Sequence, residues 1–187
     1  MTERADAPFL RATLHGSETL GDRIMKVNHA GEQGAIAVYA TQRWIARWRA
    51  PDMVAELTHF LDHERRHRSL FAAELAARGR PRCRSFHLCT LSGFAAGIMT
   101  GLMGRQAIAA TTVAIERVVL RHLTMQLAAL DGKDPAACST IRAIIADEQE
   151  HYDRSAARLG PPTMLERAID YAVATATETV IWLGMRL

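Results

Sequence analysis

Two helical segments each carry a glutamate and a histidine three positions apart. Glu64 and His67 lie in LDHERRHRSL, and Glu148 and His151 lie in ADEQEHYD. This spacing points both side chains of a pair toward one side of a helix, so each pair can reach a common metal ion. Charged residues rarely lie on the buried side of a helix unless they are paired or bind a metal. We therefore interpret both pairs as candidate metal ligands.

A single glutamate precedes each pair by the same distance. Glu32 comes 32 positions before Glu64, and Glu116 comes 32 positions before Glu148. The whole set recurs after 84 positions, which indicates that one helical hairpin is used twice. Each copy would supply one glutamate from its first helix and a Glu-x-x-His pair from its second.

The combined set supplies four carboxylates and two imidazoles, from Glu32, Glu64, His67, Glu116, Glu148 and His151. This is the ligand count of a dinuclear iron or manganese site inside a four-helix bundle. Four converging negative charges are unfavourable without cations, and two divalent ions would balance them. Zinc does not need so many oxygen ligands, and magnesium or calcium does not favour two histidines. The sequence predicts a two-metal centre whose ligands act catalytically through the metals.

Other polar residues near these positions have no counterpart in the repeat. We interpret five of them as surface residues or as support for the ligands: His59, His63, Glu56, Glu74 and Glu150. Tyr39 lies on the stripe of Glu32 and is expected in the core. His122 either supports a ligand or is an ordinary histidine with satisfied hydrogen bonds.

The rest of the chain supplies long helices to position these residues. Apolar residues recur every three to four positions, and strand patterns are nearly absent. Asp52 is predicted to cap the second helix. We predict helices at about Leu20–Trp48, Met53–Arg78, Gln106–Leu130, Ala136–Leu159 and Thr163–Leu187, with an apolar, glycine-rich segment at Phe86–Gly104.

Length and composition favour one domain. The 187 residues are 49% apolar and 23% charged, so we expect an N-terminal tail at 1–19 and a single domain at 20–187. The net charge of +3 says little about partners, and we expect no nucleic acid among them. Three cysteines without paired spacing favour a reducing compartment. The first twenty residues show no pattern of a secretory signal or transit peptide.

Several segments carry a family resemblance. The stretch RIMKVNHAGEQGAIAVYATQ resembles the first-helix signature of the demethoxyubiquinone hydroxylases, ferritin-like di-iron enzymes of coenzyme Q biosynthesis. The similarity continues through DHERRHRSLF, GFAAGIMTGLMGRQA, TTVAIE and ADEQEHYD, from about Leu20 to Leu187. It implies an all-α, ferritin-like four-helix bundle with additional interfacial and C-terminal helices. The family's iron ligands fall on the same six residues that the repeat selects.

Three positions depart from the family pattern. Asn28 stands where an aspartate is usual, Arg117 where a second glutamate is usual, and Leu123 where a tyrosine is usual. The six ligand positions are unchanged. The absence of a tyrosine at position 123 is expected to affect substrate contact or electron delivery.

The resemblance also implies an activity. Such an enzyme is a mono-oxygenase that binds two iron ions and uses dioxygen and two electrons to hydroxylate the ring of demethoxyubiquinone, an isoprenoid quinone. The chain has no GxGxxG motif after a strand, so electrons are expected from an external donor or directly from NADH. Other proteins of ubiquinone biosynthesis are implied as partners.

A lipid substrate favours contact with a membrane. Phe86–Gly104 is apolar but rich in glycine, and Arg78, Arg80, Arg82 and Arg84 precede it. We predict that this segment lies in the interface while the arginines meet anionic head groups. The expected location is peripheral, on the cytoplasmic face of a bacterial inner membrane, or on the matrix side of the inner membrane in a mitochondrion. The alternative is a core helix behind a solvated basic loop.

Two other classes of protein remain open as alternatives. A ferroxidase or iron-storage protein would use a similar bundle, but as a soluble cage it has no need of an apolar segment beside a basic loop. A membrane-associated helical protein without metal would require the repeated Glu and His set to be coincidental.

Overall fold

The computed structural model describes residues 11–187, and this part of the chain is helical without strands. The first ten residues of the expected N-terminal tail lie outside the described residues. The helices are α1 (Leu20–Arg49), α2 (Val54–Ala77), α3 (Phe86–Met103), α4 (Arg105–Leu130), α5 (Pro135–Arg142), α6 (Ile145–Ala156) and α7 (Met164–Gly184), with a 3₁₀ turn, η2, at Pro51–Met53.

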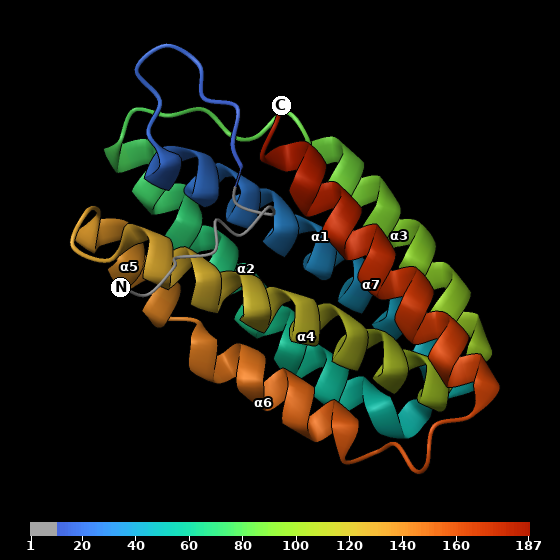
Figure 1. Cartoon of the computed structure of the whole chain (residues 1–187). Coiled ribbons are helices and arrows are strands. Elements are labelled where there is room, and N and C mark those ends of the chain that lie inside the picture. The colour runs from blue at the N-terminus through green and yellow to red at the C-terminus, as the bar shows by residue number, and fades with distance from the viewer. Residues whose placement is uncertain (1–10) are drawn as a thin grey trace, which may run out of the picture.

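Two helical hairpins form the central bundle (Figure 1). One consists of α1 and α2, and the other of α4 with the α5–α6 pair. Helix α3 packs along α1, and α7 packs along α4 beside α3. The predicted all-α, ferritin-like four-helix bundle is confirmed, with α3 and α7 as the additional helices.

Two apolar cores lie along the bundle, and a polar layer separates them. One core contains Ile24 and Met25 of α1 with Phe71 of α2, and the other contains Tyr39 of α1 with Leu57 of α2. In each of these helices the predicted metal ligands fall between the two apolar stretches. The cores therefore clamp the polar layer from both ends and exclude water from it.

Local capping chemistry explains several of the helix ends. Thr19 and Thr163 each form a capping box at the start of α1 and α7. Gly104 has a φ of 91°, a left-handed conformation that allows the sharp junction between α3 and α4. The prediction that Asp52 caps α2 is wrong, because its carboxylate instead accepts a 2.9 Å hydrogen bond from Arg105.

The predicted helix Ala136–Leu159 is wrong as a single element, because it divides into α5 and α6. At the break, the amide of Ile144 bonds to the carbonyl of Ile141 at 3.3 Å, which is a 3₁₀ rather than an α-helical step. Ile144 is fully buried in the core, so the kink lets α5 stay packed while α6 turns toward α4. Helix α6 also ends at Ala156 rather than Leu159.

Two of the four arginines before α3 have structural partners. Arg78 binds Glu74 and Asp134, each at 2.7 Å, and it is largely covered. Arg80 binds Asp22 at 2.9 Å. The prediction that all four arginines face head groups is therefore wrong for these two, whereas Arg82 and Arg84 are exposed.

Helix α3 approaches α1 unusually closely through a face of glycines. A Cβ added at Gly93 would lie 2.3 Å from the carbonyl oxygen of Gly34, and one added at Gly97 would lie 2.8 Å from the carbonyl oxygen of Val38. Only glycine permits this distance between the two backbones. Helix α3 is thus fixed on the bundle along the middle of its length.

This packing gives a stability prediction. Gly93→Ala should lower the free energy of unfolding by about 1–3 kcal/mol, because the added methyl group forces the two backbones apart. Gly31→Ala is the matched control, since an added Cβ there meets no atom within 4 Å. The control should leave stability unchanged or raise it by up to about 1 kcal/mol through helix propensity. Denaturant unfolding followed by circular dichroism measures both, and equal effects would contradict the close packing.

Candidate metal centre

The bundle brings all six predicted residues together in the buried polar layer. Their ligand atoms form two overlapping groups, and within each group the atoms lie no more than 4.8 Å apart. The groups consist of Glu32, Glu64, His67 and Glu148, and of Glu64, Glu116, Glu148 and His151. Glu64 and Glu148 belong to both groups, so their carboxylates occupy the positions from which two cations could be bridged.

The distances around the two imidazoles define the centre. Nδ1 of His67 lies 3.0 Å from a carboxylate oxygen of Glu148 and 3.8 Å from one of Glu32. Nδ1 of His151 lies 3.3 Å from Glu64 and 3.7 Å from Glu116. Each imidazole therefore turns the same nitrogen toward the carboxylates.

Several of these buried atoms lack hydrogen-bond partners among the described residues. They are Glu64 Oε1, His67 Nδ1, Glu148 Oε2 and His151 Nδ1. Buried polar atoms without partners are costly unless something else satisfies them. All four face the centre of the cluster, so the residues fit divalent cations bound by mixed oxygen and nitrogen ligands.

Burial and repulsion between the carboxylates shift the pKa values of the cluster residues. Burial, together with the charges of Glu64 and Glu148, raises the pKa of Glu32 well above its usual value. Burial and the charge of Glu148 raise the pKa of Glu116 to about 7. Burial alone would lower the pKa of His151, but the carboxylates of Glu116 and Glu148 close to its ring raise it to about 12. Without cations, protons must supply the positive charge that the carboxylates require.

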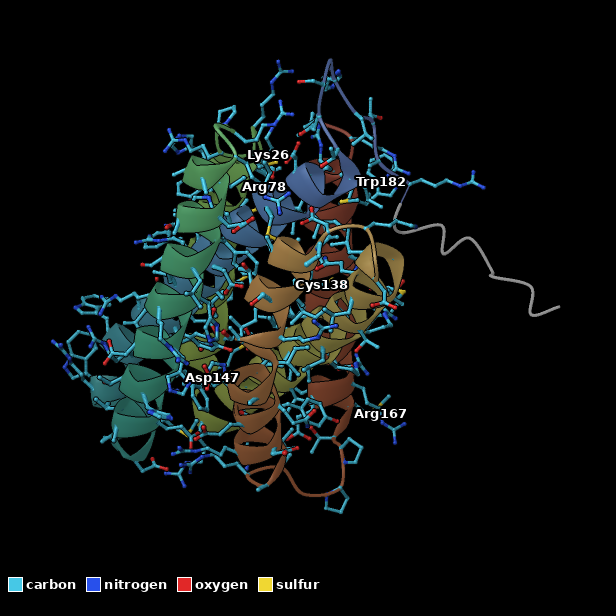
Figure 2. All side chains as sticks on the ribbon, turned by 90° about the vertical axis from the view of Figure 1, so that its left-hand side faces the viewer. Lys26, Arg78, Cys138, Asp147, Arg167 and Trp182 are labelled. Atoms are coloured by element: carbon cyan, nitrogen blue, oxygen red, sulfur yellow. The ribbon has the colours of Figure 1, made fainter. Side chains whose placement is uncertain are left out.

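A carboxylate outside the cluster orients His67. Asp147 accepts a 2.8 Å hydrogen bond from Nε2 of His67, which leaves Nδ1 free to face the other ligands. A carboxylate behind a metal-bound histidine commonly has this role. Figure 2 labels Asp147 where α6 faces α2. The sequence prediction missed this residue.

A histidine takes the corresponding place behind His151. Nδ1 of His63 lies 3.1 Å from Nε2 of His151. His63 and Asp147 are 84 positions apart, the interval of the repeat, and each supports the histidine of the other copy. That interval was the available signal, but it was obscured because the two residues differ in type. Burial and the charge of His59 lower the pKa of His63 to about 4, so the ring is neutral.

Tyr39 and His122 each have a polar partner on another helix. The hydroxyl of Tyr39, fully buried as predicted, donates a hydrogen bond to Glu116. His122 lines the pocket described below and pairs with Glu178 of α7 at 2.9 Å. Tyr39 thus fixes one carboxylate, and His122 links the pocket wall to α7.

A cavity of about 130 Å³ opens on the side of the cluster away from its histidines. Its walls come from α1, α3, α4 and α7 and are mainly apolar. Four of the six cluster residues border it, namely Glu32, Glu64, Glu116 and Glu148. An organic molecule in this cavity would therefore lie directly against the carboxylate side of the centre.

The three departures from the family pattern have different surroundings. Asn28 and Gln126 exchange two hydrogen bonds, of 2.8 and 3.0 Å, in the cavity wall. Leu123 is buried in that wall and offers no hydroxyl. Arg117 pairs with Asp170 of α7 on the surface. Two of the departures therefore alter the cavity, and the third does not touch it.

Comparison with known proteins gives a consistent result. The family described as ubiquinone biosynthesis protein COQ7 matches residues 19–184. A relative from Dictyostelium discoideum, named NADPH-dependent 3-demethoxyubiquinone 3-hydroxylase, mitochondrial, is 31% identical over 171 residues, covering 89% of this chain and 77% of the relative. The 3-demethoxyubiquinol 3-hydroxylase of Rhodospirillum rubrum is 30% identical over 167 residues, covering 89% and 78%. The mitochondrial 5-demethoxyubiquinone hydroxylase of Saccharomyces cerevisiae is 31% identical over 182 residues, with the same coverage.

The shifted pKa values predict how pH affects the stability of the metal-free chain. The fold favours the neutral form of Glu116, so this stabilisation is complete below about pH 4.5 and is lost as pH rises through about 7. His63 and His122, whose pKa values are lowered to about 4, act oppositely but only below about pH 6.5. His151, whose pKa is raised to about 12, adds a stabilisation that is complete below about pH 6.5 and is lost as pH rises above that value. The free energy of unfolding should therefore fall between about pH 6.5 and 8.

Thermal unfolding of the chelator-treated chain across this range measures the effect. Glu116→Gln should weaken the dependence, because the amide does not titrate. Added Fe²⁺ should oppose the loss, since cations then replace the protons. A metal-free wild type whose stability rises from pH 6.5 to 8 would contradict the predicted protonation of the cluster.

Proposed function

Because the chain belongs to the COQ7 family of ubiquinone biosynthesis proteins, we propose that it hydroxylates the ring of a demethoxyubiquinone at a dinuclear iron centre. The relatives' names supply the substrate class, and the donor set supplies the metal. Four carboxylates and two imidazoles suit iron, and Glu64 and Glu148, which belong to both ligand groups, would hold both ions.

The observation that carries the proposal is that the cavity opens directly onto the carboxylates of the cluster. An apolar cavity accepts a substituted benzoquinone ring, and its floor consists of the carboxylates that would hold the metals. When bound, the two irons would supply the reduction of dioxygen, with one oxygen atom entering the ring and the other leaving as water. The ring need not move far from its binding position to react.

The chain's own residues have positioning roles. Asp147 holds His67 in the tautomer that presents Nδ1, and Tyr39 holds one oxygen of Glu116. The reciprocal pair of Asn28 and Gln126 makes a polar spot in an otherwise apolar wall. We assign this spot to orientation of the quinone ring, whose oxygens are its polar groups. The apolar walls keep water from the reacting carbon.

The electrons come from a reduced nicotinamide nucleotide in this proposal. The Dictyostelium relative is named as NADPH-dependent. The described helices contain no nucleotide-binding βαβ unit, so the reductant acts from outside the bundle and the quinone itself carries the electrons inward. Other proteins of ubiquinone biosynthesis would deliver the substrate.

An iron-storage function is the alternative, and the cavity argues against it. Iron storage has no use for an apolar cavity against the carboxylates, such as the one lined here along α3 and α7. An apolar approach to a metal centre favours an organic substrate.

We assign the face formed by α3 and α7 to the membrane interface. Among the described helices, only α3 is long and apolar enough to cross a membrane by length and composition, and 28% of it is buried. Its glycine face is packed on α1, so it lies along the bundle rather than spanning alone. The face carries large exposed apolar side chains, namely Leu88, Leu91, Phe94, Met99, Leu102 and Met103 of α3 and Met164, Leu165, Tyr171 and Trp182 of α7.

This interface would admit the isoprenoid tail of the substrate. Helices α3 and α7 line both the exposed apolar face and the cavity, so a tail could leave the cavity directly into lipid. We place the protein peripherally at an inner membrane, on the cytoplasmic face in a bacterium or the matrix side in a mitochondrion. Mitochondrial relatives are named among those compared.

The catalytic proposal predicts coupled losses of iron and activity. Glu148→Ala removes a carboxylate shared by both ligand groups, so bound iron should fall to trace levels and ring hydroxylation should drop by about 100-fold or more. Asp153→Asn, an exposed change on the same helix, is the control and should retain both. Elemental analysis after anaerobic Fe²⁺ loading and chromatography of a short-tailed quinone product measure the outcome. Wild type that retains only trace iron would refute the dinuclear centre.

The membrane proposal predicts two separable losses. Replacing Arg82 and Arg84 with glutamine should weaken binding to anionic vesicles about 30-fold at low salt, at roughly 1 kcal/mol for each charge. Replacing Leu91 and Phe94 with serine should weaken binding at every salt concentration, because it removes exposed apolar area that the membrane would cover.

Vesicle flotation measures both effects. The charge-matched control replaces Arg65 and Arg142, which are exposed on α2 and α5, and it should bind as wild type does. Failure of the wild type to float with either anionic or neutral vesicles would refute the interface.

A further inference from the structure

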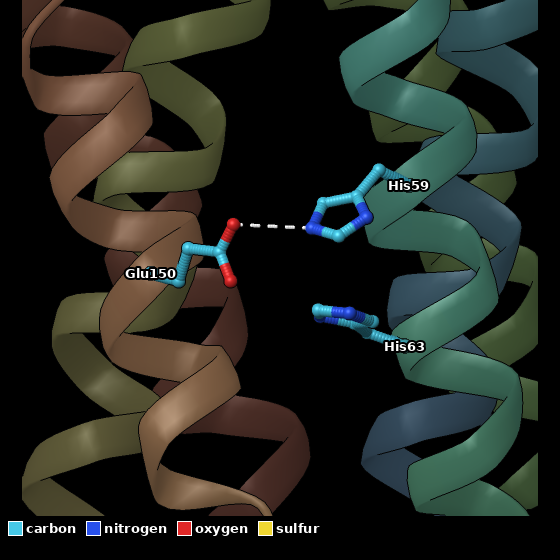
Figure 3. A group of neighbouring side chains, drawn as sticks. All are labelled: His59, His63 and Glu150. Carbon is cyan, nitrogen blue, oxygen red and sulfur yellow. Dashed lines mark hydrogen bonds and ion pairs between the residues drawn. The ribbon is translucent and has the colours of Figure 1, made fainter.

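A second group of metal-binding side chains lies outside the buried cluster. His59 and His63 are one turn apart on α2, and Glu150 faces them from α6 (Figure 3). One ligand atom from each of the three residues lies within 4.8 Å of the others. Two histidines four positions apart on one helix face form a common chelating pair for transition metals.

The spacing of these atoms suits a bound cation. Nε2 of His59 lies 3.1 Å from Oε1 of Glu150. Ligand bonds of about 2.1 Å place neighbouring donor atoms roughly 3.0–3.4 Å apart in octahedral or tetrahedral geometry. A cation could therefore replace this hydrogen bond without moving either helix. Arg154 also donates a hydrogen bond to Oε1, at 2.9 Å, and holds the Glu150 carboxylate in place.

The group is accessible, unlike the buried cluster. The side chains of His59 and Glu150 are each 40% exposed, and that of His63 is 19% exposed. Three protein ligands leave coordination positions for water. Imidazole nitrogen with carboxylate oxygen suits divalent iron, cobalt or zinc.

His63 connects this group to the buried cluster. Its Nδ1 contacts Nε2 of His151, which leaves its own Nε2 as the nitrogen for an outer cation. If His63 and His151 both bound cations through their other nitrogens, both facing nitrogens would carry hydrogen, and the 3.1 Å contact would become repulsive. Occupancy of the outer group and occupancy at His151 therefore oppose each other.

We propose that His59, His63 and Glu150 form an outer site for a divalent transition-metal cation, from which the buried cluster is filled. The filling step rests on the proposed dinuclear centre, whereas the outer site does not. Because the His63–His151 contact disfavours occupancy of both sites at once, the outer site holds a cation only during transfer and is not a permanent third metal site. Cations enter on the side of α2 and α6, opposite the cavity.

Zinc binding seen by nuclear magnetic resonance tests the outer site directly. Zn²⁺ added to the metal-free chain with ¹⁵N-labelled histidine should shift the ring nitrogens of His59 and His63. The affinity of the outer site for Zn²⁺ should be about tenfold higher in His151→Ala than in wild type with a filled cluster, because the contact between His63 and His151 is gone. If neither His59 nor His63 shifts in either protein, the outer site is refuted.

The filling step is tested by the rate at which cations become resistant to a chelator. The double variant His59→Gln, Glu150→Gln keeps the His63–His151 contact and should fill the buried cluster about tenfold more slowly with Co²⁺, to the same final content. The control pair His87→Gln and Asp153→Asn also removes one imidazole and one carboxylate, at exposed positions, and should fill as wild type does. Equal rates in all three proteins would refute the filling route.

The outcomes separate the two proposals. If the rings of His59 and His63 respond to Zn²⁺ while wild type never retains cations against the chelator, the outer site stands and the dinuclear centre fails. If cations are retained but those rings do not respond, the dinuclear centre stands and the outer site fails.

Discussion

The convergence of four glutamates in one buried layer is the constraint on which the rest of this structure depends. Removing carboxylates from water is strongly unfavourable, and each one raises the free energy of ionising its neighbours. This cost is offset because positive charge, from protons on the histidines and carboxylates or from bound cations, lies among the carboxylates. The apolar cores on both sides of the layer make the arrangement rigid and dry. The same exclusion of water that makes the bare cluster unfavourable would make it bind metals tightly.

The centre has two chemically different sides. Toward α2 and α6, Asp147 and His63 stand behind the two histidines and fix which ring nitrogen faces inward. Toward α1, α3, α4 and α7, the carboxylates border an apolar cavity. Cations suit the first side and an aromatic organic molecule suits the second. This division would let cations and an organic molecule reach the centre from different sides.

Helix α3 connects the cavity to the surface. Its glycines bring it against α1, so its backbone forms part of the cavity wall, and its opposite face presents large apolar side chains outward. The apolar surface does not stabilise the fold, since nothing in the described chain covers it. Its position beside α7 and over the cavity would suit that surface to receiving a lipid-like molecule.

The sequence by itself determined the helical class and the six cluster residues. Side-chain direction repeats with a fixed period along a helix, so Glu64 and His67 had to share a face, and the 84-residue repeat related the two hairpins. Only the tertiary structure decided which atoms meet. The packing of α6 opposite α2 made Glu64 and Glu148 the shared carboxylates and set Asp147 behind His67. The kink at Ile144 and the ion pairs of Arg78 likewise depend on partners distant in sequence. Spacing along one helix fixes a face, but contacts between helices depend on their relative rotation, depth and tilt, which no local pattern encodes.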